Sequence, residues 1–225
     1  MTSRRLVLQL DFDGTLVHGD VNEGLFRRFV SEEWTDRIEA ASRELRRNAS
    51  SPALIDALKE ASAHLEATDA ECLAFAVANN PPRDGLTELI ATAQRFGMEC
   101  HVVSYGFEFY VRHYLRLAGV DAGLQVHGGE TSPGRTGRLL RYLGPESLDV
   151  AFDWKMVWTR EFRGRADTLV YAGDGGSDVA PAQLCDVVFA RDVLLRNMPP
   201  SFKGTLRSFK TLHDIAKGLE EILGG

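Results

Sequence analysis

Largely apolar runs separated by amphipathic stretches recur along most of the chain. Leu6–Leu10, Met98–Val103 and Thr168–Ala172 are short apolar runs, whereas Leu86–Phe96 repeats its apolar side chains with helical spacing. Short apolar runs of this kind are typical of strands buried on both faces of a parallel sheet. Their alternation with helices predicts an α/β fold with a doubly wound, mostly parallel, Rossmann-like sheet. Further predicted elements are helices over Phe107–Ala118, Phe152–Phe162, Asp178–Cys185 and Leu212–Ile222, strands near Leu124–Val126 and over Val187–Ala190, and a loop or hairpin over Gly128–Gly137.

Residues 18–81 depart from this alternation, because they read as helices with no strand between them. A capping-box pattern from Thr68 to Glu71 marks the start of one helix, and Pro81-Pro82 closes the segment. We therefore predict an α/β core domain made of residues 1–17 and 82–225. A small helical cap domain, residues 18–81, is inserted into it after the first strand.

Composition and charge narrow the class of protein. Of the 225 residues, 44% are apolar, which permits a sizeable core, and the formal net charge is −6. Nucleic-acid-binding proteins are usually basic or carry a basic stripe, so no nucleic-acid partner is expected. No apolar run approaches the roughly 18 to 20 residues of a membrane helix, and no signal peptide is visible, so we expect a cytoplasmic protein with no membrane partner. The pattern leaves open whether the chain is a monomer or a homodimer.

Polar side chains stand where three of the predicted strands end. Asp11 and Asp13 follow the first strand, Ser104 follows the second, and Asp174 follows the strand over Thr168–Ala172. In open α/β sheets, ligands bind at the carboxyl ends of the strands. These side chains are therefore expected to share one site.

The Asp11-Phe-Asp13-Gly14-Thr15 segment could carry the central chemistry of phosphate-ester hydrolysis. At a strand end, a loop can aim both carboxylates at one small volume. Asp11 could attack phosphorus as a nucleophile, and Asp13 could donate a proton to the leaving oxygen and later take one from water. Asp-Gly is also a common turn pair, so this segment alone is equally compatible with a simple strand-to-turn ending.

The Gly-rich segment from Gly173 to Asp178 provides two carboxylates, Asp174 and Asp178, in a form that suits a hard cation such as Mg²⁺. The same segment could also be a loop that leads into a capped helix. The Ser104 hydroxyl could bind a phosphate oxygen, and the Lys155 ammonium could offset phosphate charge. Taken singly, a serine at a strand end and a surface lysine are the commoner interpretations.

The order of these four motifs along the chain resembles the haloacid dehalogenase-like superfamily. The resemblance covers nearly the whole length and implies a phosphatase that forms an aspartyl-phosphate on a small phosphorylated metabolite. It implies that the aspartates bind Mg²⁺, and that Asp13 does so through its backbone carbonyl. The implied roles are Asp11 as nucleophile, Asp13 as acid and base, Ser104 and Lys155 on the phosphate, and Asp11, Asp13, Asp174 and Asp178 around the metal.

Two segments narrow the resemblance, Val103-Ser104-Tyr105-Gly106-Phe107 and Phe189-Ala190-Arg191-Asp192. The first is similar to the phosphoserine phosphatase-like branch of the superfamily, and the second to its methionine-salvage enolic-phosphate phosphatases. Tyr105 stands where that branch has a glycine beside the phosphate, so it is expected at the phosphate site. Cap residues His18, Asp20 and Asn22 are expected to contact substrate, with Asp20 where phosphoserine phosphatases carry a longer glutamate. Asp13 disfavours a dehalogenase, because a halide leaves without a proton. A phosphotransferase and a non-catalytic phosphate-binding module stay open.

Overall fold

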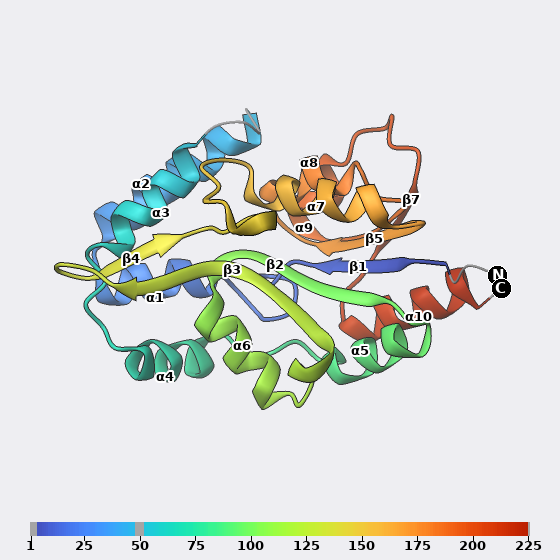
Figure 1. Ribbon diagram of the computed structural model, residues 1–225, viewed down its shortest axis with the longest axis horizontal. Helices are drawn as coiled ribbons and strands as arrows, with labels where there is room; N and C mark the ends of the chain where they lie inside the picture. The colour runs from blue at the N-terminus through green and yellow to red at the C-terminus, as the bar shows by residue number, and fades with distance from the viewer. Residues whose placement is uncertain (1–3, 48–51, 225) are drawn as a thin grey trace.

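The computed structural model describes residues 4–47 and 52–224, and its centre is a seven-stranded sheet (Figure 1). The strand order is β4-β3-β2-β1-β5-β6-β7, and every pairing is parallel except that of β3 with β4. This arrangement confirms the predicted α/β fold with a mostly parallel sheet. The strands are β1 Leu6–Leu10, β2 Glu99–Phe107, β3 Leu124–Pro133, β4 Arg138–Arg141, β5 Thr168–Gly173, β6 Val187–Ala190 and β7 Thr205–Ser208.

The central strands are the most apolar part of the chain, as their sequence predicts. Every residue of β1 and β5 is buried. β1 lies between β2 and β5, with Leu10 paired to Val102 on one side and to Ala172 on the other. The carboxyl ends of these three strands therefore lie next to one another.

Two strands extend beyond their predicted ends. β2 does not end at Ser104 but continues to Phe107, because a register shift against β3 between Val103 and Phe107 lets the strand change direction without ending. β3 continues to Pro133 and turns back into β4, so the predicted loop or hairpin at Gly128–Gly137 belongs to an antiparallel hairpin at the edge of the sheet.

Helices cover both faces of the sheet. In Figure 1, α5 (Leu86–Arg95), α6 (Glu108–Leu117) and α10 (Leu212–Leu223) lie on one side. The opposite side carries α7 (Trp154–Arg165), α8 (Val179–Ala182) and α9 (Asp192–Asn197). No helix of the described ranges is long and apolar enough to span a membrane.

The segment after β1 forms four helices: α1 Val21–Phe29, α2 Glu32–Arg47, α3 Ala53–Ser62 and α4 Asp69–Asn79. The segment leaves and re-enters the core at one point, where Val17 pairs with Pro82 and the His18 amide donates to the Pro81 carbonyl. The capping box at Thr68 and Glu71 forms as expected at the start of α4. The division into a core and a cap domain stays a prediction.

Candidate active site

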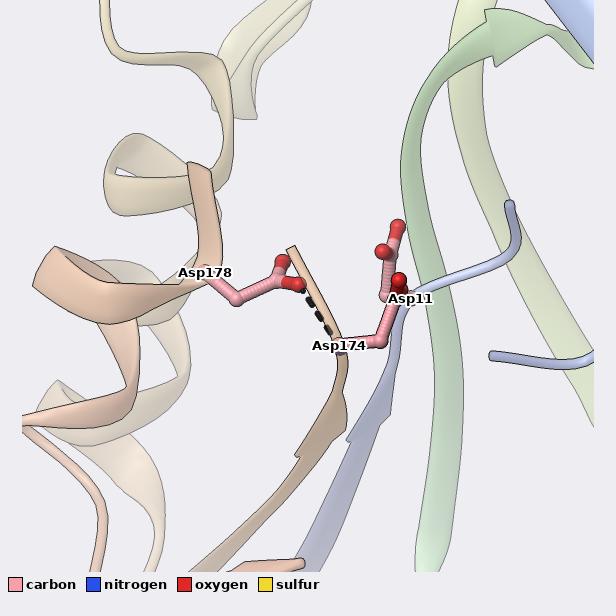
Figure 2. A group of neighbouring side chains, drawn as sticks. All are labelled: Asp11, Asp174 and Asp178. Atoms are coloured by element: carbon pink, nitrogen blue, oxygen red, sulfur yellow. Dashed lines mark hydrogen bonds between the residues drawn. The ribbon is translucent and has the colours of Figure 1, made fainter. Parts of the chain in front are cut away.

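Three neighbouring strand ends bring the predicted polar residues to one cavity. Asp11 follows β1, Ser104 lies near the end of β2, Asp174 follows β5, and all of them line a cavity of about 620 Å³. Figure 2 shows the carboxylates of Asp11 and Asp174 side by side at the ends of β1 and β5, with Asp178 across from them. Lys155 reaches the cavity from the first turn of α7.

A buried ammonium joins two of the carboxylates. Lys155 Nζ lies 2.6 Å from Asp11 Oδ1 and 2.6 Å from Asp178 Oδ1, and all three side chains are buried. Burial lowers the pKa of Lys155, but the two carboxylates outweigh it and raise the pKa, so the side chain stays cationic. Burial, followed by the charge of Asp178, raises the pKa of Asp11 well above its usual range, and Lys155 opposes this rise.

Asp178 organises the Gly-rich loop. Its Oδ1 accepts hydrogen bonds from Lys155 and from Tyr171 Oη, and its Oδ2 accepts from the backbone amides of Asp174 and Gly175. Four donors therefore already surround this carboxylate. The contacts favour a role in holding the loop and Lys155, while the prediction that Asp178 is itself a metal ligand stays a prediction.

The Asp174 carboxylate lies against the backbone of Gly14. Gly14 has φ +71°, and a Cβ built on it would lie 2.3 Å from Asp174 Oδ2, so only glycine fits here. The Thr15 hydroxyl donates to Asp174 Oδ1 over 3.0 Å. Burial and then the charge of Asp178 raise the pKa of Asp174 to about 7.

The carboxylates fit a hard divalent cation. One oxygen from each of Asp11, Asp174 and Asp178 lies within 4.8 Å of the other two. Burial first, and then the neighbouring carboxylate of Asp178, raises the pKa of both Asp11 and Asp174, while Lys155 opposes the rise. Carboxylate oxygens are the ligands that Mg²⁺ prefers, usually one or two to each ion. Asp11 and Asp174 are therefore the side chains best suited to hold it.

Asp13 lines the same cavity and contacts the start of α1. Its Oδ1 accepts a 2.8 Å hydrogen bond from the Val21 amide, and Tyr110 Oη lies 3.5 Å from its Oδ2. Burial, then the charge of Asp20, raises the pKa of Asp13 well above its usual range. A carboxyl group with a raised pKa can keep a proton at neutral pH, as a general acid must.

The predicted phosphate-binding residues also line the cavity. Ser104 Oγ accepts from the Gly106 amide over 2.9 Å, which leaves its own proton free to be donated. The Tyr105 ring centroid lies 5.8 Å from Lys155 Nζ, so its face rather than its hydroxyl approaches the ammonium.

The three predicted cap contacts, His18, Asp20 and Asn22, line the cavity as well. Asp20 is the N-cap of α1, and its carboxylate accepts from the Glu23 amide. Asn22 is buried, donates to the Tyr105 carbonyl and accepts from the Tyr110 hydroxyl. Two of the three therefore also have structural partners.

Several cavity residues were not predicted. Arg83 follows Pro82 and donates to the carbonyls of Gly14 and Thr15, and Arg191 follows β6. Only its position after Pro81-Pro82 could have pointed to Arg83, whereas Arg191 lies in a segment, Phe189–Asp192, that resembles the methionine-salvage enzymes. Helices α2 and α3 add a partly apolar wall to the cavity, made of Thr35, Ile38, Ser42, Leu54 and Leu58.

The sequence and the fold of the chain are similar to those of known proteins. The family model of haloacid dehalogenase-like hydrolase matches residues 9–183. The chain is 23% identical over 226 residues to the 2-hydroxy-3-keto-5-methylthiopentenyl-1-phosphate phosphatase of Brevibacillus brevis, covering 98% of this chain and 97% of that protein. It is 27% identical over 200 residues to the bifunctional enzyme MtnB/MtnX of Bacillus licheniformis, covering 86% of this chain and 44% of that protein.

Among solved structures, phosphoserine phosphatases have the same fold. A phospho-aspartyl intermediate analogue of phosphoserine phosphatase superposes with a TM-score of 0.69 at 19% identity, over 96% of this chain and 99% of the other. A substrate-bound phosphoserine phosphatase complex gives a TM-score of 0.68 at 17% identity, over 96% and 98%. At these identities the likeness shows a shared fold.

Proposed function

The chain belongs to the haloacid dehalogenase-like hydrolase family, and from this premise we propose that it is a magnesium-dependent phosphatase of a small phosphorylated metabolite. The observation that carries the proposal is the buried constellation of Asp11, Lys155 and Asp174 at the ends of adjacent strands, with Asp13 beside it. These residues provide a nucleophile, a cation for phosphate charge, a metal ligand and a proton donor.

In the first step, a carboxylate oxygen of Asp11 attacks phosphorus, and the bond between phosphorus and the leaving oxygen breaks. Asp13 gives its proton to that oxygen, so an alcohol leaves and an aspartyl-phosphate remains. In the second step, Asp13 takes a proton from a water molecule that attacks phosphorus. The bond from phosphorus to Asp11 breaks, inorganic phosphate leaves, and both carboxyl groups return to their starting states.

Lys155 and Ser104 bind the transferring phosphoryl group in this proposal. The Lys155 ammonium lies between Asp11 and Asp178, so it fixes the attacking carboxylate and places a positive charge where phosphate oxygens must lie. The free proton of the Ser104 hydroxyl is directed to a phosphate oxygen. Asp11 and Asp174 would hold Mg²⁺, which when bound supplies further positive charge to the phosphoryl oxygens.

The substrate is small, because the cap helices close one side of the cavity. Residues of α2 and α3 form part of the wall of the cavity, whose volume is about 620 Å³. Relatives of the chain are named as phosphatases of a phosphorylated methylthiopentenyl compound. A phosphomonoester of similar size is therefore the first candidate.

The proposal is tested by phosphate release from a panel of small phosphomonoesters, with Mg²⁺ and with EDTA. We expect release that needs Mg²⁺ and is abolished by Asp11→Asn. The matched control is Asp56→Asn, an identical change at an exposed position on α3. Equal release by the Asp11 variant, or no release from any compound by the unaltered protein, would contradict the proposal.

A further inference from the structure

The segment Ser104–Gly106, which carries the predicted phosphate ligand Ser104, lies outside the regular pairing of the sheet. Pairing of β2 with β1 ends at Val102, and pairing of β2 with β3 passes from Val103 directly to Phe107. The regular ladder therefore does not fix the peptide groups of this segment. Buried backbone carbonyls still need hydrogen-bond donors, so these donors come from elsewhere.

Side chains from three other elements supply the donors. Tyr142, which follows β4, donates its hydroxyl proton to the Tyr105 carbonyl over 2.6 Å. Asn22 of α1 donates to the same oxygen over 2.9 Å. Trp154 Nε1, at the start of α7, donates to the Ser104 carbonyl over 3.2 Å. A carbonyl oxygen has two lone pairs, so both acceptor positions of the Tyr105 carbonyl are filled.

The Tyr105 carbonyl belongs to the peptide group that holds the Ser104 hydroxyl. This carbonyl and the Gly106 N–H are parts of one planar trans peptide group, in which C=O and N–H point in opposite directions. The Gly106 N–H donates to Ser104 Oγ over 2.9 Å. Because Tyr142 and Asn22 fix the carbonyl, they also fix the N–H that Ser104 Oγ accepts from. The Ser104 proton is then left for an acceptor in the cavity.

The Asn22 amide has a fixed direction. A backbone carbonyl can only accept, so the nitrogen of Asn22 faces Tyr105, and its Oδ1 accepts from the Tyr110 hydroxyl over 3.2 Å. A Cβ built on Gly106 would clash with this Tyr110 hydroxyl, so the same packing requires glycine at position 106. The hydrogen bond from Asn22 is therefore part of a tightly packed arrangement around the Ser104–Gly106 segment.

Tyr142 has no direct access to a substrate. Its side chain is fully buried, and it is not among the described residues that line the cavity. Ser104 does line the cavity. Any effect of the Tyr142 hydroxyl on a bound phosphoryl group therefore passes through the Ser104–Gly106 segment.

We propose that Tyr142 is a positioning residue for phosphate binding. Together with Asn22 it fixes the peptide group between Tyr105 and Gly106, and this peptide group aims the Ser104 hydroxyl at a phosphoryl oxygen. The inference rests on the proposed phosphatase function and adds to the phosphoryl site a residue that does not touch the substrate.

The test is a double-mutant cycle on the binding of inorganic phosphate, measured with Mg²⁺ by isothermal titration calorimetry. Tyr142→Phe is expected to weaken phosphate binding about fivefold, the value of one hydrogen bond from Ser104. Ser104→Ala is expected to cause a loss of similar size. The variant with both changes should bind no more weakly than Ser104→Ala alone, because both changes remove the same hydrogen bond to phosphate.

The matched control is Tyr114→Phe. It also removes the hydroxyl of a buried tyrosine that donates to a backbone carbonyl, that of Asn80 over 2.8 Å, and it should leave phosphate affinity unchanged. Asn22→Leu provides a second variant, and it is expected to lose phosphate affinity only while Ser104 is present.

A general structural effect of Tyr142→Phe would weaken phosphate binding by the same factor with Ser104 present or replaced, and that result would overturn the proposal. Unchanged affinity in Tyr142→Phe, or no binding of phosphate by the unaltered protein, would also overturn it. Hydrolysis of phosphomonoesters is measured separately. A protein that binds phosphate but hydrolyses no ester would contradict the proposed function, and the binding cycle would still decide on Tyr142.

Discussion

Replacing Lys155 by methionine tests whether the buried ammonium holds the site together. Lys155 bridges Asp11 and Asp178, and the exposed fractions of the three side chains are 3%, 7% and 0%. Removing one partner of a buried ion pair leaves an uncompensated charge and costs about 3–5 kcal/mol. Methionine keeps most of the volume, so little of the loss comes from a cavity. Because two carboxylates lose their partner together, we expect a loss of about 4 kcal/mol in the free energy of unfolding.

The assay is equilibrium unfolding in urea at pH 7 with EDTA, where no bound cation can replace the ammonium. The control is Lys59→Met, whose partner Asp149 is 49% exposed, and it is expected to cost less than about 1 kcal/mol. Adding Asp11→Asn to the Lys155 variant removes one of the stranded charges and should recover part of the lost stability. A loss below about 1 kcal/mol, or no recovery in the double variant, would refute the reasoning.

Three further predictions follow from the same contacts. Asp13→Asn should slow hydrolysis of alkyl phosphates about 10²–10⁴-fold, because their leaving oxygen needs a proton. The same variant should spare the first burst of nitrophenol from p-nitrophenyl phosphate, because nitrophenolate leaves without a proton. Stopped-flow absorbance measures the burst, and equal slowing of both reactions would contradict the prediction. Gly14→Ala should abolish Mg²⁺ binding in calorimetry, because the added Cβ would lie 2.3 Å from Asp174 Oδ2 and displace this carboxylate. An unchanged affinity for Mg²⁺ would contradict the prediction. The pKa of Asp174 is raised from 3.8 to about 7, so its contribution to stability is present at low pH and is lost as pH rises through this window. In the proposed function Mg²⁺ binds the ionised carboxylate of Asp174, so any increase in melting temperature on adding Mg²⁺ should grow from pH 4 to pH 7. An increase that does not vary with pH would count against this prediction.

The sequence predicted the centre of the fold because the centre depends on local signals. Strands β1 and β5 are apolar runs that stop at an aspartate, and parallel strands place their carboxyl ends at one edge of the sheet. Asp11 and Asp174 could therefore be placed together without the structure. The family match confirms the resemblance that these motifs indicated.

The parts that were not predicted depend on contacts between distant segments. Arg83 donates to carbonyls of Gly14 and Thr15, 69 and 68 residues away in the chain, and nothing in its own neighbours signals this. Tyr110 is fully buried, yet its hydroxyl also reaches Asn22 and Asp13. A single sequence shows that such a side chain is apolar enough to be buried, but not where its polar atom will point.

Asp13 is physically joined to α1. It follows β1 in the chain, and its Oδ1 accepts a hydrogen bond from the amide of Val21, the first residue of α1. On its other side, Tyr110 contacts both Asp13 and Asn22, and Asn22 donates in turn to the carbonyl of Tyr105. The orientation of the carboxyl group therefore depends on where α1 begins. A displacement of α1 would therefore break the Val21 hydrogen bond. In the proposed reaction, where Asp13 is the acid and base, the position of α1 sets both the orientation of the proton donor and the part of the cavity wall that Asn22 and Glu23 form.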